Sequence, residues 1–196
     1  VFHFSGKLVG QLTQKWEARM RNFFVISLLV VFLAGCNTLS GTRSYTSDPR
    51  SFLDYAAVNK DVKTIVISHS SLAKKSELET LVTENLNQSY YYLHTNFKTA
   101  NTANMQKPYR IVFAFNPPIQ TTSDQICASP ESLKSLPAGE NIFIMAVFCE
   151  NQPLTEVVAN VDFKGSAKKA NLRDAIKQLA ISLVPQEEPM KSFSSE

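Results

Sequence analysis

A run of twelve uncharged, mostly apolar residues at positions 23–34 constrains this chain more than any other feature. The run reads FFVISLLVVFLA and follows Arg21. It is too short to cross a bilayer, which takes about 20 such residues. An apolar run of this length after a positive charge is typical of a secretory signal peptide. We therefore expect residues 1–35 to direct export and to take no part in the folded domain.

The run ends in Leu33-Ala34-Gly35-Cys36, a tetrapeptide that resembles the lipobox of bacterial lipoproteins. That motif has an aliphatic residue, two small residues and then a cysteine. The resemblance implies that Cys36 is acylated, as with palmitate, and becomes the first residue of the mature chain. Each buried methylene of an acyl chain contributes about 0.8 kcal/mol, so several chains together anchor a protein firmly. The alternative is a buried N-terminal helix with an ordinary core cysteine.

Two details around the lipobox refine this expectation. Residues 1–19 precede Met20, which would itself serve as a start, so we expect them to arise from an upstream mis-start or to extend the positive region. Asn37 stands where many inner-membrane lipoproteins of enteric bacteria carry Asp. The resemblance therefore implies a lipid anchor in the outer membrane, on its periplasmic face. Four matching residues identify a class of lipoprotein and no specific family.

Charge and glycine content exclude two classes of function. The formal net charge is +3, and residues 1–35 account for all of it, so the remaining chain is balanced. A nucleic-acid binder carries a basic footprint, which is missing from this balanced body. Only Gly41, Gly139 and Gly165 follow the lipobox, too few and too scattered for a dinucleotide or phosphate loop.

The hydrophobic pattern divides the mature chain into a tether, one domain and a tail. Polar residues dominate 36–60, which predicts a flexible tether, and also 186–196, a polar tail. Alternating or continuous apolar residues predict strands at 62–69, 109–115, 142–149 and 155–163, the last two paired as a hairpin. Helical spacing predicts helices at 78–97 and 172–183, the first begun by a capping box of Ser76 and Glu79. Residues 61–185 should therefore form an α+β two-layer sandwich, with a four-stranded mostly antiparallel or mixed sheet and two helices on one face, in the order β-α-β-β-β-α.

The loop at 116–141 contains Cys127, and Cys149 ends the strand that follows. In an exported chain, two remaining cysteines indicate first a disulfide, which would fasten the loop to the sheet edge. A buried free Cys149 with an exposed Cys127, or an intermolecular bond, remain the alternatives. Loops of this length in compact domains are often functional, so Asn116, Pro117 and Pro118 are candidate partner contacts.

Catalytic and metal-binding patterns are weak. His69 follows a strand in Ser68-His69-Ser70-Ser71, but no nucleophile elbow accompanies it, and a loop-capping role suits it better than catalysis. Histidines and cysteines lack metal-ligand spacing, so we expect no metal and no cofactor. Tyr90-Tyr91-Tyr92 cannot all face inward on a helix, which makes Tyr91 and Tyr92 candidate partner contacts. The alternative is that one tyrosine packs in the core while the others cover its rim.

These features predict a lipid-anchored periplasmic protein that acts as a non-catalytic accessory or assembly subunit in the cell envelope. Its expected partner is another envelope protein. A binder of a small or lipidic ligand, held between sheet and helices, is the alternative. An envelope hydrolase using His69 is a third hypothesis.

Overall fold

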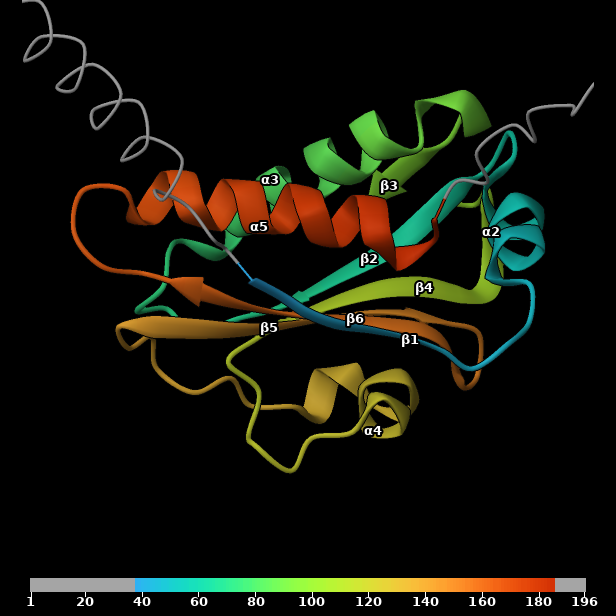
Figure 1. Ribbon diagram of the computed structural model, residues 1–196. Coiled ribbons are helices and arrows are strands. Elements are labelled where there is room, and N and C mark those ends of the chain that lie inside the picture. The colour runs from blue at the N-terminus through green and yellow to red at the C-terminus, as the bar shows by residue number, and fades with distance from the viewer. Residues whose placement is uncertain (1–37, 186–196) are drawn as a thin grey trace, which may run out of the picture. The chain divides into compact units, whose positions relative to one another are not determined.

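The computed structural model describes residues 38–185, which belong to one compact unit (Figure 1). The predicted signal peptide, Cys36 and the tail at 186–196 lie outside the described residues. In chain order the elements are β1 Thr38–Ser44, α2 Pro49–Ala57, β2 Asp61–Ile67, α3 Lys75–Ser89, the 3-10 helix η1 Tyr91–Leu93, β3 Asn96–Lys98, β4 Met105–Phe115, α4 Ser123–Ala128, the 3-10 helix η2 Pro130–Ser132, β5 Asn141–Cys149, β6 Pro153–Asp162 and α5 Lys168–Leu183.

The six strands form one mixed sheet in the order β1-β6-β5-β4-β2-β3. β2 pairs in parallel with β3 and β4, while the pairs β4–β5, β5–β6 and β6–β1 are antiparallel. The α+β class and the β5–β6 hairpin are confirmed. The expected count of four strands and two helices is wrong, because β1, β3, α2 and α4 are additional elements.

The expected flexible tether is wrong over most of its described part. Residues 38–44 pair with β6 as an edge strand, and α2 follows almost at once. Asp48 begins α2 by accepting a hydrogen bond from the Ser51 backbone N–H at 3.0 Å, and Pro49 occupies the first turn. Ala56 and Ala57 are buried against the core, so this segment belongs to the domain.

The first predicted helix is shorter than expected. α3 ends at Ser89, and the chain continues through η1 into the three-residue strand β3 instead of remaining helical to residue 97. The expected capping box is also absent, since Lys74 is the N-cap and Ser76 lies within the helix. The capping box in the structure joins Thr122 and Gln125 at the start of α4.

Both faces of the sheet are covered, because β4 and β5 carry apolar residues at every position of their centres. Ile111, Phe113 and Phe115 point to the core shared with α3 and α5. Val112 and Ala114 point to a second, smaller core beneath α4. Figure 1 shows α3 and α5 on one face and α4 on the other. The expectation of two layers is therefore corrected to three layers over the centre of the sheet.

Strand direction defines two ends of the domain. β2 and β6 run the same way and lead into α3 and α5, which return over the sheet side by side in parallel. The first residues of α3, α5 and β1 therefore gather at one end, which we call the proximal end. The last residues of α3 and α5, together with η1, α2 and the β5–β6 turn, lie at the opposite, distal end.

Candidate functional site

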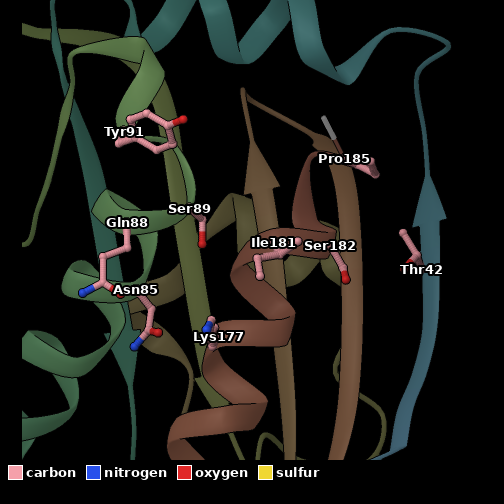
Figure 2. Close-up of a pocket in the computed structure, with 9 residues that line it drawn as sticks. All are labelled: Thr42, Asn85, Gln88, Ser89, Tyr91, Lys177, Ile181, Ser182 and Pro185. Carbon is pink, nitrogen blue, oxygen red and sulfur yellow. The ribbon is translucent and has the colours of Figure 1, made fainter. Parts of the chain in front are cut away.

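A hollow of about 790 Å³ lies at the distal end, where α3 and α5 finish beside β1. We call it the distal groove, and Figure 2 shows its lining side chains. They are Thr42, Asn85, Gln88, Ser89, Tyr91, Lys177, Ile181, Ser182 and Pro185. Most of these side chains carry an amide or a hydroxyl group, which forms hydrogen bonds but is a weak acid, base and nucleophile. Lys177 is the single charged residue among them. The lining therefore suits binding.

Tyr91 and Ile181 are the two large, exposed hydrophobic residues that line the groove. Their exposed fractions are 75% and 44%. Tyr91 begins η1, while Ile181 lies in the last turn of α5, so the two residues come from different helices that share the groove. An exposed tyrosine with an apolar neighbour is typical of protein contact surfaces.

The three consecutive tyrosines have three different environments. Tyr90 is fully buried, and its hydroxyl donates to the Ala180 carbonyl at 2.6 Å while accepting from the Val184 N–H at 3.0 Å. Burial raises the pKa of Tyr90 well above its ordinary value. Tyr90 thus locks the end of α5 to the end of α3, and Tyr91, next in the chain, is turned outward.

Tyr92 is half-buried beneath Arg50 of α2, whose guanidinium carbon lies 4.5 Å from the ring centre. Arg50 also pairs with Asp54, with 2.8 Å between Nε and Oδ1. Burial raises the pKa of Tyr92, and the Arg50 charge opposes that rise. Tyr92 therefore connects η1 to α2 and contributes less surface to a partner than Tyr91 does.

β1 forms the long open edge of the sheet beside this groove. Among the described strands it pairs only with β6, and its residues from Leu39 to Ser44 are exposed. The register shifts between Leu39 and Gly41, and Arg43 adds a charge. Such irregularities and charges are the means by which proteins prevent unwanted strand addition at an edge.

The other predicted contacts, at 116–118, lie far from Tyr91, at the proximal end where β4 finishes. Asn116 is at φ 46°, and its side-chain oxygen accepts from the Phe143 N–H at 2.8 Å. Its side-chain amide donates to the Pro137 carbonyl at 3.2 Å. Pro117 is buried and Pro118 exposed. The structure therefore divides the predicted contact residues between two separate surfaces.

Cys127 and Cys149 form a disulfide, with 5.6 Å between their Cα atoms. Both side chains are fully buried. The bond fastens α4 to the last residue of β5 and so holds the loop over the face of the sheet instead of at its edge. The carbonyl of Cys127 also accepts a hydrogen bond from the Arg110 guanidinium.

His69 organises the turn that follows β2. Its Nδ1 atom accepts from the Ser71 N–H at 3.1 Å and lies 2.9 Å from the Ser71 hydroxyl. That hydroxyl oxygen accepts from the Ala138 N–H at 2.9 Å, which ties the turn to the long loop. These contacts agree with the loop-capping role. Within residues 38–185, no group of three or more His, Cys, Asp or Glu residues could hold a metal ion.

Comparisons with known proteins give no match. No protein-family model, no curated protein and no solved structure matches the chain. None of the helices in the described part of the chain is long and apolar enough to span a membrane.

Proposed function

We propose that this protein is a lipoprotein anchored through Cys36 at the periplasmic face of the outer membrane, where it serves as a non-catalytic accessory or assembly subunit. The supporting observation is the position of the distal groove. Cys36 precedes Thr38, the first residue of β1, by two positions in the sequence, and β1 begins at the proximal end, whereas Tyr91 and Ile181 lie at the distal end. An anchor at Cys36 would leave the distal groove open to an envelope partner.

The distal groove is the contact surface in this proposal. It combines an exposed aromatic residue, an exposed aliphatic residue and several uncharged hydrogen-bonding groups, which is the composition expected of a modest protein interface. A flexible tether is not needed, because the groove already faces away from the anchored end.

Affinity purification from detergent-solubilised envelopes tests this proposal. The intact protein is compared with Cys36→Ser, which removes the acylation site, and with Tyr91→Ala/Ile181→Ser, which removes the apolar surface of the groove. Ile119→Ser is the matched control, because Ile119 is fully exposed but lies in the loop before α4. We expect a stoichiometric partner that is lost in the first two variants and kept in the control. A clean monomer in every preparation would contradict the subunit role.

A ligand-binding role is the second candidate, since the groove volume of about 790 Å³ falls within the range of small-molecule sites. Native mass spectrometry of the protein purified from envelopes would detect a bound small or lipidic molecule. Its loss in Tyr91→Ala/Ile181→Ser would favour this role over the subunit role.

A further inference from the structure

A cluster of cations marks the proximal end. Residues 163–173 read FKGSAKKANLR, with four basic side chains, and the exposed Asp162 and Asp174 lie directly before and after them. Lys164 pairs with Glu140 at 2.9 Å, and Lys168 lies 5.4 Å from the centre of the Phe163 ring. Lys168, Lys169 and Arg173 are exposed and make no ion pair within residues 38–185. We call residues 163–173 the basic segment.

The basic segment lies beside the first residues of β1. Thr38 is in register with Asn160, two residues before the end of β6. The side-chain amide of Asn160 donates to the Ser40 hydroxyl at 3.2 Å, and that of Asn171 donates to the Asp162 carbonyl at 3.0 Å. These contacts hold the start of β1, the end of β6 and the first turn of α5 together.

Only Asn37 separates Cys36 from Thr38 in the sequence. Because one residue extends a chain by only about 3.5 Å, an acyl anchor on Cys36 would hold the start of β1 close to the membrane surface. If Cys36 carries acyl chains in the bilayer, the chain therefore brings the basic segment to the headgroup layer. This step rests on the proposed function.

We propose that the basic segment binds the surface of a bilayer that contains anionic phospholipid, and so sets the orientation of the domain on the membrane. Anionic headgroups attract lysine and arginine within a Debye length of the surface. Lys168, Lys169 and Arg173 of α5 line a second hollow, of about 640 Å³, together with Glu77 and Glu84 of α3. α3 packs over β2 and β3, the strands farthest from β1, so Glu77 and Glu84 lie on the far side of this hollow from β1, while Asp162 and Asp174 lie on the same side as the cations.

Charge on the opposite face of the sheet agrees with this orientation. Residues 116–139, which include α4, contain Asp124 and Glu131 against a single basic residue, Lys134, whereas Glu140 pairs with Lys164 of the basic segment. An anionic surface would repel that segment and attract the basic segment, so one orientation is favoured over its reverse.

Single-tryptophan reporters test the orientation. Trp16, the only tryptophan of the sequence, precedes Cys36, so in the processed chain that begins at Cys36 each introduced tryptophan is the single reporter. Ser166→Trp places a reporter in the exposed turn after β6, and Asn151→Trp places one in the exposed turn before β6. The two turns are separated by the ten residues of β6, which span about 33 Å. The lipidated chain that begins at Cys36 is reconstituted into vesicles with brominated phosphatidylcholine, with or without phosphatidylglycerol.

We expect the bromolipid to quench Ser166→Trp at least about twofold more strongly than Asn151→Trp when phosphatidylglycerol is present. Adding Lys168→Gln/Lys169→Gln should remove most of that difference. Lys107→Gln/Lys134→Gln is the matched control, since it removes two exposed charges elsewhere and should leave the difference unchanged. Raising the salt concentration should reduce the difference in quenching in the same way as Lys168→Gln/Lys169→Gln, because salt screens the attraction between the cations and the headgroups.

Equal quenching of the two reporters, or quenching that is independent of phosphatidylglycerol and of Lys168 and Lys169, would overturn the inference. A second copy of the chain that covers Ser166→Trp would also overturn the inference. It would be detected as a cross-linked dimer in both neutral and anionic vesicles. Mass spectrometry of the same preparations separates the two proposals. A chain without acyl groups contradicts the proposed anchor, whereas an acylated chain without oriented quenching contradicts the basic segment alone.

Discussion

Replacing Tyr90 with phenylalanine should destabilise the domain, although it removes a single oxygen atom. The Tyr90 hydroxyl lies between the Ala180 carbonyl and the Val184 N–H, and all three residues are fully buried. Without the hydroxyl, the carbonyl and the N–H each lose a partner in a site that excludes water. A buried unsatisfied group costs about 1–3 kcal/mol. The total cost is smaller if the carbonyl and the N–H move closer and partly hydrogen-bond to each other. We expect a loss of about 2 kcal/mol.

Urea denaturation followed by circular dichroism measures this loss, and thermal melting should show a midpoint lowered by about 4–8 °C. Tyr91→Phe is the matched control, because Tyr91 is 75% exposed and its hydroxyl makes no hydrogen bond within the described residues. The control should stay within about 0.5 kcal/mol of the unmodified protein. Equal stability of Tyr90→Phe and Tyr91→Phe would refute the view that the Tyr90 hydroxyl completes the end of α5.

Three further predictions concern the loop and the sheet. Reducing the Cys127–Cys149 bond, which spans 22 residues, should lower the free energy of unfolding by about 3 kcal/mol, measured by urea titration with and without reductant. Asn116→Ala should lower the free energy of unfolding by about 2 kcal/mol in the same titration, because it loses two side-chain hydrogen bonds and places alanine at a φ of 46°. Asn116→Gly should recover the part of this loss that is due to φ, because glycine adopts a positive φ without strain. Burial raises the pKa of Asp61, but hydrogen bonds from Thr102, Lys98 and Asn96 outweigh burial and lower it overall. The pKa of Asp61 is therefore lower in the folded protein than in the unfolded chain. Its carboxylate stabilises the fold at pH values above the pKa of the unfolded chain, and this stabilisation is lost as the pH falls through the pKa of the folded protein. The excess stability of the unmodified protein over Asp61→Asn should accordingly shrink between about pH 7 and about pH 3, as thermal melting would show, and a constant difference would contradict this assignment.

The sequence predicted the elements that bury a regular apolar pattern. β4, β5, β6 and α5 each have such a pattern, because each packs on the central core. β1 was missed because its sequence TLSGTRS is polar and every described side chain in it from Leu39 on is exposed. An edge strand is held by backbone hydrogen bonds to its neighbour, and these leave no hydrophobic signal. β3 was missed because three residues are too few for a period.

Local capping signals were ambiguous for a physical reason. Ser76 with Glu79 and Thr122 with Gln125 both match the spacing of a capping box. Only the second pair forms one, because the fold places Thr122 before a helix, whereas α3 already begins at Lys75. The Thr122 signal could have revealed α4 in the sequence.

The groove itself could not be predicted from the sequence. Tyr91, Ile181 and Thr42 come from η1, α5 and β1, and only the strand order brings them into one hollow. The tyrosine triplet did indicate an outward-facing residue, and Tyr91 is that residue. The prediction that it contacts a partner remains to be tested.

Mass spectrometry of the N-terminal peptide of the protein purified from its own envelope tests the central claim most directly. We expect a chain that begins at Cys36 and carries diacylglycerol and a further acyl group, with no such mass in Cys36→Ser. Cys127→Ser/Cys149→Ser should keep the acyl groups, which excludes modification of the other cysteines. A chain that retains the residues before Cys36 and carries no acyl group would contradict the account.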